Sequence, residues 1–183
     1  HSQMKAAIAQ KKGIFENEIS PVEIHQRKAE PIIFKNDEFL KPHTSIDGLA
    51  KLKPAFKKEG TVTAGNSSGL NDGSAAMLIA SENGVKMHNL NPLARIVASA
   101  VVGVEPRIMG IGPVQAANKA LAKAGLTMDD MDVIELNEAF SAQLLACIRQ
   151  WNLADDDARI NPNGGAIALG HPLGMTGTRI LQT

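Results

Sequence analysis

Five glycines surround a single histidine in the stretch 161–178, and this stretch constrains the fold of the chain most strongly. It reads Asn-Pro-Asn-Gly-Gly-Ala-Ile-Ala-Leu-Gly-His-Pro-Leu-Gly-Met-Thr-Gly-Thr. Glycine permits backbone angles and close approaches that a side chain forbids, and proline suits the first turn of a helix. We therefore predict that His171 lies where a glycine-rich loop enters a helix at Pro172.

The predicted position of His171 has a chemical consequence. A helix start carries a partial positive charge, which disfavours an added proton on a neighbouring imidazole. A neutral and rigidly held imidazole can accept a proton, so the stretch favours a catalytic site. The alternatives are a phosphate-cradling loop and a tight turn around a histidine with ordinary partners. Neither nucleotide fingerprint is present, because there is no G-x-G-x-x-G and no Lys-Ser/Thr pair after the last glycine.

The charges of the chain balance, with 19 basic and 19 acidic residues and no long run of one sign. Without an excess of one charge, the sequence gives no indication of a nucleic-acid partner or of a membrane-binding face. With 183 residues, of which 44% are hydrophobic and 21% charged, the chain can bury a core as ordinary globular proteins do. No apolar run is long enough to span a bilayer.

Cys147 is the only cysteine, which excludes an internal disulfide framework, and no cluster of Cys and His has metal-ligand spacing. We therefore expect no metal site, and a reducing compartment, the cytoplasm. Cys147 lies in an apolar helical run, which favours an inert buried thiol over a nucleophile. Helical patterns run up to both ends of the chain, so we expect it to be a piece of a longer protein.

Helical and extended patterns alternate along the chain, which predicts an α/β protein. The predicted helices are 4–12, a segment from 46 that Pro54 limits, a short helix after Ser81, 110–124, one after Phe140 and one from Pro172. The predicted strands are 22–25, 31–34, 61–63, 93–102 and 133–136, and 75–80 is expected to be a buried strand or helix segment. Asn137 directly follows the last strand, and in open α/β sheets sites form at that end of a strand.

Four stretches closely resemble the motifs of the thiolase family, in the family's order and at compatible spacing. They are Asn66–Gly73, Gly103–Pro113, Asn137–Phe140 and Gly164–Gly174. The resemblance implies a layered α-β-α-β-α fold of two similar α/β halves, with a loop domain inserted in the first half. It also implies that the fold is incomplete here. Residues 1–60 would be the remainder of the loop domain, 61–90 the end of the N-terminal half, and 91–183 a truncated C-terminal half.

The resemblance implies an acyl-CoA acyltransferase that catalyses reversible Claisen condensation or thiolytic cleavage of 3-ketoacyl-CoA. CoA and acyl-CoA would be substrates, no cofactor would be permanently bound, and the full-length enzyme would be a homodimer or homotetramer. The family uses two cysteines, and the resemblance places both outside residues 1–183, so we expect the chain alone to be inactive. Lys41-Pro42-x-Thr44 is similar to the 3-oxoadipyl-CoA branch, and acetoacetyl-CoA thiolase is a comparable alternative.

His171 and Asn137 match the family's catalytic residues. Removing an α-proton from a thioester places negative charge on its oxygen, so hydrogen-bond donors must be waiting there. The resemblance gives His171 two tasks, assisting the acylated cysteine and donating to the thioester oxygen. Asn137 would hold a water that donates to the same oxygen. The residues that match CoA-binding positions are Ser68, which bonds the pantetheine arm, Phe56, Met109, Ala139 and Phe140, which line it, and Lys41, which lies near the nucleotide.

Two other functions remain open at this point. One is a non-catalytic CoA- or lipid-binding relative of the thiolases, and the other is a nucleotide-binding α/β module with a glycine loop. The intact Asn-Glu-Ala-Phe and Gly-His-Pro motifs count against the first function. The missing nucleotide fingerprints count against the second.

Overall fold

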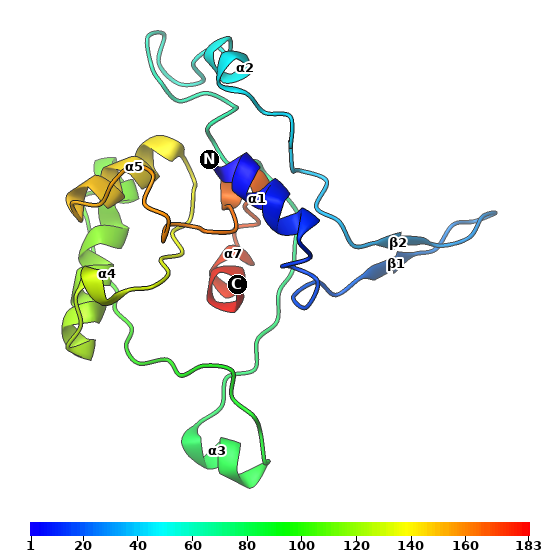
Figure 1. Ribbon diagram of the computed structural model, residues 1–183, viewed down its shortest axis with the longest axis vertical. Coiled ribbons are helices and arrows are strands. Elements are labelled where there is room, and N and C mark those ends of the chain that lie inside the picture. Colours follow the sequence, from blue (N-terminus) through cyan, green and yellow to red (C-terminus); the bar gives the residue numbers. More distant parts are fainter.

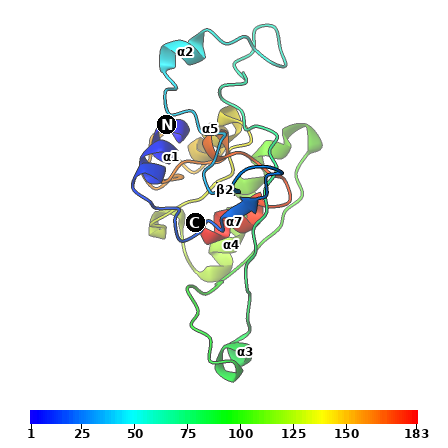
Figure 2. The ribbon, with the colours of Figure 1, turned by 90° about the vertical axis from the view of Figure 1, so that its right-hand side faces the viewer.

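Seven helices, two 3-10 turns and one hairpin form the regular structure of the computed structural model, which describes residues 1–183 (Figure 1). Their bounds are α1 Ser2–Lys11, β1 Val22–Ile24, β2 Ile32–Phe34, α2 Ile46–Ala50, α3 Glu82–Met87, η1 Pro106–Ile111, α4 Gly112–Ala124, η2 Met128–Asp130, α5 Ser141–Gln150, α6 Ala166–Leu169 and α7 Thr176–Gln182. Helix α1 packs against α6 near the centre, and α4 and α5 pack together on one side. Helices α2 and α3 lie toward opposite ends of the longest axis (Figure 2).

Local signals account for several helix boundaries. The side chain of Ser81 accepts a hydrogen bond from the Gly84 N–H at 3.1 Å, which caps α3 as the sequence predicts. Gly125 ends α4 in the left-handed region at φ 70°, where glycine carries no steric penalty. Helix α2 ends at Ala50, earlier than the apolar spacing toward Phe56 suggests, because Pro54 cannot donate a helical hydrogen bond and also restricts the residue before it.

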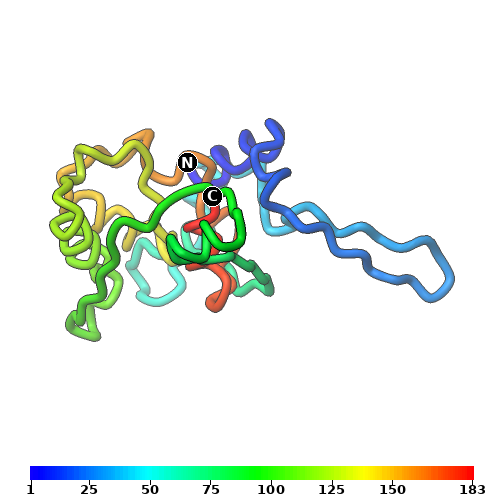
Figure 3. The backbone as a smooth tube through the Cα atoms, turned by 90° about the horizontal axis from the view of Figure 1, so that it is seen from below, coloured from blue at the N-terminus to red at the C-terminus, as the bar shows by residue number.

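The hairpin β1–β2 confirms the two predicted strands near the start of the chain. It is antiparallel, and Glu23 lies opposite Ile33 in its register. Both strands project away from the rest of the molecule (Figure 3), and all six of their residues are exposed. The alternation of apolar and polar residues in 22–25 is typical of a half-buried strand, but here no other segment covers either face.

The other predicted strands form no sheet within this chain. Segments 61–63, 75–80, 93–102 and 133–136 have no strand ladder, and only isolated bridges such as Ile134 with Ile160 occur there. The segment 75–80 is exposed throughout, which corrects the expectation that it is buried. A strand needs a neighbouring strand to satisfy its backbone groups. The segments 75–80 and 93–102 have no such neighbour in this chain, and 61–63 and 133–136 have only a single bridge each, to Pro54 and to Ile160.

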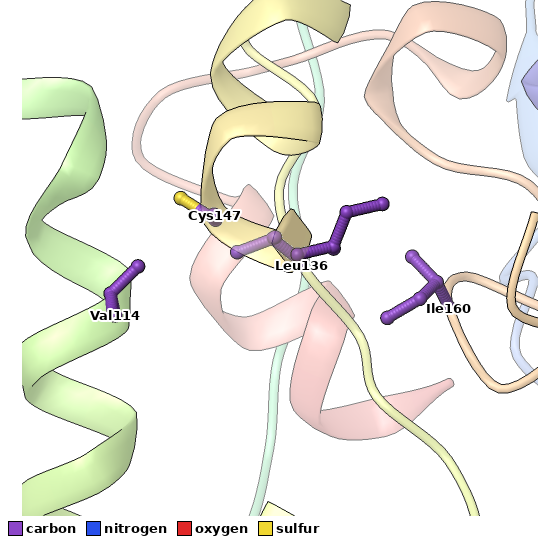
Figure 4. Packing of buried hydrophobic residues seen from close by; sticks show 5 residues of the cluster. Val114, Leu136, Cys147 and Ile160 are labelled. Carbon is purple, nitrogen blue, oxygen red and sulfur yellow. The ribbon is translucent and has the colours of Figure 1, made fainter. Parts of the chain in front are cut away.

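The largest apolar core lies between α4, α5 and the segment that leads to Asn137. Its buried members are Val114, Leu136, Cys147, Ile148 and Ile160 (Figure 4). Cys147 and Ile148 are fully buried, which confirms the prediction of a buried thiol. Because Leu136 is anchored in this core, the core also fixes where the next residue, Asn137, leaves the segment.

Candidate active site

Asn137 is positioned by a short parallel pairing in which a side chain completes the ladder. The Ile134 N–H donates to the carbonyl of Arg159 at 2.9 Å, and the Asn161 N–H donates to the carbonyl of Ile134 at 3.0 Å. The Asn161 side chain then continues the pairing, because its Oδ1 accepts from the Leu136 N–H and its Nδ2 donates to the Leu136 carbonyl, both at 2.8 Å. The backbone groups of Ile134 and Leu136 are therefore satisfied even though no second strand is present.

Glu138 is a buried carboxylate that joins three parts of the site. Its oxygens accept hydrogen bonds from the Ser2 hydroxyl at 2.6 Å, from Asn161 Nδ2 at 3.0 Å and from the Ile167 N–H at 3.1 Å. A Cβ at Gly165 would collide with this carboxylate, so a glycine is required there. The three donors replace the hydrogen bonds to water that the carboxylate loses on burial. Through these bonds Glu138 connects α1, α6 and the segment of Asn137.

His171 directly follows the turn at Gly170, whose φ of 89° favours glycine. Helix α7 begins at Thr176, five residues later, so the prediction that His171 lies directly at a helix start is corrected. The Pro172 carbonyl accepts from the Met175 and Thr176 N–H groups at 2.9 and 3.0 Å, which makes one separate turn before α7. The side chain of His171 is therefore controlled by its own hydrogen bonds rather than by the α7 dipole.

The loop 66–73 holds the Asn137 and His171 segments together. The Ser68 N–H donates to the Ala139 carbonyl at 3.0 Å, next to Asn137. Asn71 Oδ1 accepts from the His171 N–H at 3.3 Å, and the Asn71 side chain occupies the space that a Cβ at Gly170 would need. The loop therefore contacts both predicted catalytic segments.

Asn137 and His171 meet at their side chains. Asn137 Nδ2 lies 3.3 Å from His171 Nε2, and His171 Nδ1 lies 2.8 Å from the Thr176 hydroxyl. Asn137 Oδ1 is buried and has no hydrogen-bond partner within the chain. A cavity of about 240 Å³ opens beside His171 between Leu70 and Leu173. This arrangement places the His171 ring at a surface that a ligand can reach, with the Asn137 amide against its Nε2.

The residues predicted to bind CoA are partly brought together. The Ser68 hydroxyl donates to the Ala139 carbonyl at 3.3 Å, and the ring of Phe140 meets that of Phe56 edge to face with centroids 5.8 Å apart. Met109 lies in η1, is 76% exposed, and has no hydrogen bond or ring contact with the others.

Lys41 is linked to the same region through a neighbouring ring. Its Nζ lies 4.6 Å from the centroid of the Phe39 ring, and its backbone N–H donates to Gln3 Oε1 at 2.7 Å. The Phe39 ring in turn occupies the space that a Cβ at Gly69 would need, so it packs directly on the loop 66–73. The Lys41 ammonium is therefore held at the rim of the site by a cation–π contact.

The Cys147 thiol forms its hydrogen bonds with residues outside this site. Its thiol donates to the Gly110 carbonyl at 3.4 Å and accepts from Gln143 Nε2 at 3.6 Å. Burial raises the pKa of the Cys147 thiol, which disfavours the reactive thiolate, although the Gln143 hydrogen bond acts in the opposite direction. No group of three or more His, Cys, Asp or Glu side chains is arranged to hold a metal ion.

Replacing Cys147 by serine should leave acyl-transfer activity of the full-length protein within about twofold of wild type, since a structural thiol contributes no nucleophile. Serine keeps the donor to the Gly110 carbonyl and nearly the same volume. Steady-state kcat and KM with a 3-ketoacyl-CoA substrate measure the effect. Loss of turnover in a variant that still unfolds as cooperatively as wild type would make Cys147 the nucleophile.

Glu135, two residues before Asn137, and Arg179 in α7 form a largely buried pair. Glu135 Oε2 and Arg179 Nη1 are 4.0 Å apart, and their side chains are only 10% and 15% exposed. Burial raises the pKa of Glu135 to about 6, although the charge of Arg179 lowers it in part. The carboxyl therefore binds a proton more tightly in the folded protein than in the unfolded chain, where its pKa is 4.5.

The raised pKa of Glu135 predicts a pH dependence of stability. The contribution of the protonated carboxyl is fully present below about pH 4.5 and is lost as the pH rises through about 6. The difference between 4.5 and about 6 corresponds to about 2 kcal/mol, at about 1.4 kcal/mol per pH unit. Relative to Glu135→Gln, the wild-type free energy of unfolding should fall by nearly that amount between pH 4 and pH 7, which bracket both pKa values. Denaturant titrations at pH 4 and pH 7 measure it, with exposed Glu82→Gln as the control, and equal pH slopes in wild type and Glu135→Gln would contradict it.

Sequence reasoning missed the residues that support the site. They are Ser2, Asn71, Glu138, Asn161 and Thr176, and all of them act through hydrogen bonds to segments of other motifs or to the turn after His171. Asn71 and Glu138 stand inside the stretches that resemble the family, and Asn161 and Thr176 stand inside the glycine-rich stretch 161–178, so these stretches themselves carried the signal. Asn161 stands at φ 42°, a left-handed position that asparagine tolerates and that no local pattern reveals.

Residues 1–83 match the family model described as thiolase, N-terminal domain, and residues 90–183 match that described as thiolase, C-terminal domain. The beta-ketoadipyl-CoA thiolase of Acinetobacter baylyi is 59% identical over 182 residues, which are 100% of this chain and 45% of that relative. The acetyl-CoA acetyltransferase of Chromobacterium violaceum is 56% identical, over 100% of this chain and 46% of its own. The chain thus spans about 45% of the length of the curated relatives it matches.

The comparison with solved structures agrees with the sequence matches. The crystal structure of the Bacillus anthracis acetyl-CoA acetyltransferase matches with a TM-score of 0.93 and 46% identity, over 98% of this chain and 45% of its own. Human mitochondrial 3-ketoacyl-CoA thiolase in complex with CoA matches with a TM-score of 0.89 and 50% identity, over 98% and 44%. These matches confirm the layered α/β fold class. More than half of each of these chains lies outside the matched part.

Proposed function

Because this chain belongs to the thiolase family, we propose that the protein containing it is an acyl-CoA acyltransferase. The reaction is reversible Claisen condensation and thiolytic cleavage of 3-ketoacyl-CoA. The observation that carries the proposal is the 3.3 Å approach of Asn137 Nδ2 to His171 Nε2. Two motifs 34 residues apart are brought together there, as a shared catalytic task requires.

His171 works through Nε2. The thiol that takes the acyl group belongs to a part of the protein outside residues 1–183, because the one thiol within them, Cys147, is buried against Gly110. His171 Nε2 takes the proton of that thiol, so its S–H bond breaks as an N–H bond forms. The thiolate then attacks the ketoacyl carbonyl, and the carbon–carbon bond breaks to leave the enolate of acetyl-CoA.

The enolate oxygen needs donors as its negative charge grows. The protonated Nε2 of His171 supplies one such donor, and Asn137 positions a water that supplies another. Asn137 Oδ1 has no hydrogen-bond partner within the chain, which supports this role because a buried acceptor is rarely left unpaired. Protonation of the enolate carbon by a second group completes the cleavage, and free CoA then releases the acyl group from the thiol.

CoA lies along the surface formed by the loop 66–73 and the start of α5. Ser68 bonds the amides of the pantetheine arm, and Phe56, Ala139 and Phe140 pack against its apolar parts, with Met109 further along. Lys41 attracts the phosphates of the nucleotide, as a point charge rather than as the planar fork of an arginine. The edge-to-face rings of Phe56 and Phe140 support this position of CoA. They form an apolar surface directly beside Ala139, whose carbonyl accepts the hydrogen bond from the Ser68 hydroxyl.

The sequence Lys41-Pro42-x-Thr44 favours 3-oxoadipyl-CoA as the substrate, with acetoacetyl-CoA the alternative. Thr44 Oγ1 donates to the Lys41 carbonyl at 2.8 Å, so the motif forms a closed turn at the rim.

The same proposal includes a homodimer or homotetramer in the cytoplasm, and no permanently bound cofactor. Residues 1–60 belong to the loop domain, 61–90 to the N-terminal half and 91–183 to the C-terminal half. No helix in the structure combines the length and apolar character that a membrane crossing requires.

Thiolysis by the full-length protein tests the proposed function. Acetoacetyl-CoA and 3-oxoadipyl-CoA are each incubated with free CoA, and acetyl-CoA is quantified by mass spectrometry. We expect CoA-dependent cleavage with a kcat of about 1–10³ s⁻¹ for the better substrate. Tight binding of CoA without any acetyl-CoA formation from either substrate would overturn the proposal and would indicate the non-catalytic CoA-binding alternative.

A further inference from the structure

The Thr176 hydroxyl occupies a position between His171 and a backbone carbonyl. Thr176 is 3% exposed, and its Oγ1 lies 2.8 Å from His171 Nδ1 and 3.0 Å from the carbonyl oxygen of Pro172. A hydroxyl has one proton to donate, whereas a carbonyl oxygen can only accept. If the hydroxyl proton goes to the Pro172 carbonyl, the Thr176 oxygen must accept from the ring, and Nδ1 must carry a hydrogen.

The other ring nitrogen agrees with this assignment. Asn137 Nδ2, an N–H donor, faces His171 Nε2 at 3.3 Å. A neutral imidazole has one N–H and one lone pair. With the hydrogen on Nδ1, the lone pair is on Nε2, and both ring nitrogens are satisfied at once. With the hydrogen on Nε2, two N–H donors would face each other.

The Thr176 hydroxyl is itself held in place from both sides. Pro172 is buried, and the space that a Cβ at Gly73 would need is filled by its ring, so the loop 66–73 fixes the carbonyl that receives the Thr176 proton. The Met175 and Thr176 N–H groups also bond this carbonyl, which closes the turn around it. The hydroxyl therefore has little freedom to turn its proton toward the ring.

We propose that Thr176 is a positioning residue that fixes His171 in the Nδ1–H tautomer and so keeps the lone pair on Nε2. This inference rests on the proposed function, in which Nε2 takes the thiol proton and then donates to the thioester oxygen. The hydrogen bond from Nδ1 to Thr176 persists through both steps, since only Nε2 gains and loses a proton. Thr176 never touches the substrate and acts only through His171.

Two variants and a control separate positioning from packing. Thr176→Val keeps the shape of the side chain and removes the hydroxyl, whereas Thr176→Ser keeps the hydroxyl and removes a methyl group. Thr178→Val makes the same chemical change two residues further on, where no hydrogen bond to the ring is present. All are made in the full-length protein, and kcat and KM for thiolysis are measured alongside ¹⁵N NMR of ¹⁵N-histidine-labelled protein, with His171 assigned by its loss in His171→Ala.

In the resting wild type we expect the ¹⁵N shifts of His171 to show a protonated Nδ1 and an unprotonated Nε2. Thr176→Val should mix the two tautomers and lower kcat about 10–100-fold with KM nearly unchanged, which is the effect found when the hydrogen-bond partner that orients a metal-bound histidine is removed. Thr176→Ser and Thr178→Val should keep the wild-type shifts and rates.

Two results would overturn the inference. One is an Nε2-protonated His171 in wild type, and the other is a Thr176→Val protein that keeps the wild-type shifts. The NMR measurement needs no turnover, so it decides the tautomer even where the thiolysis assay fails. Conversely, an active wild type with unaltered shifts in Thr176→Val leaves the proposed function intact and removes only the role of Thr176.

Discussion

Replacing His171 by alanine should lower kcat/KM for thiolysis about 10³-fold, within the 10²–10⁴-fold that a general acid–base group contributes. The variant loses both the acceptor of the thiol proton and a donor to the enolate oxygen. The rest of the site should persist, because the bond from the His171 N–H to Asn71 belongs to the backbone. Steady-state kinetics on the full-length protein, together with its free energy of unfolding, measure the effect.

His25→Ala is the matched control for His171→Ala. His25 lies next to the projecting hairpin, its side chain is 83% exposed, and its one ionic contact is with Glu23 at 3.5 Å. We expect this variant to be as active and as stable as wild type. Equal and small losses in the two variants would show that His171 has no catalytic task.

Asn161→Ala should lower the free energy of unfolding by about 3–5 kcal/mol, the size seen when a buried hydrogen-bond network is broken. Asn161 is 2% exposed, and its side chain bonds both backbone groups of Leu136 and one carboxylate oxygen of Glu138. Alanine leaves all three without this partner. It also takes up a φ of 42° that asparagine tolerates better than alanine. Denaturant unfolding measures the loss, and kcat should fall with it because Asn137 is no longer held.

Two further variants divide the effect of Asn161→Ala between its causes. Asn161→Gly removes the hydrogen bonds without strain at positive φ, and it should lose nearly as much stability as alanine. Asn152→Ala places alanine at a similar φ of 57° on an exposed residue, and it should cost only about 1 kcal/mol. A loss in Asn152→Ala equal to that in Asn161→Ala would mean that backbone strain, not the network, dominates.

What the sequence could predict depended on local chemistry. The serine before α3, the glycine after α4 and the proline that limits α2 act over one turn, and the structure has each boundary close to where they place it. The pairing of Asn137 with His171 was also predicted, but from the resemblance of whole motifs. Neither residue by itself indicates the other across 34 positions.

What the sequence could not predict depended on distant partners. The segments 75–80 and 93–102 have strand-like composition, yet whether they pair is decided by neighbours that composition does not reveal. The helix-start argument for His171 was wrong for a similar reason, since it used the nearest helix and missed the Thr176 hydroxyl. Asn161 is the clearest case, because an ordinary asparagine in a polar run completes the backbone pairing of Leu136.

The most direct test is a crystal structure of the full-length protein with a bound acyl-CoA, and the quantity to measure is the distance from His171 Nε2 to the thioester oxygen. Acyl transfer at this site requires that distance to be about 2.7–3.2 Å, the range of a hydrogen bond, with the pantetheine arm beside Ser68 and Phe140. An acyl-CoA bound elsewhere, or with its thioester turned away from both His171 and Asn137, would contradict the assignment of this site.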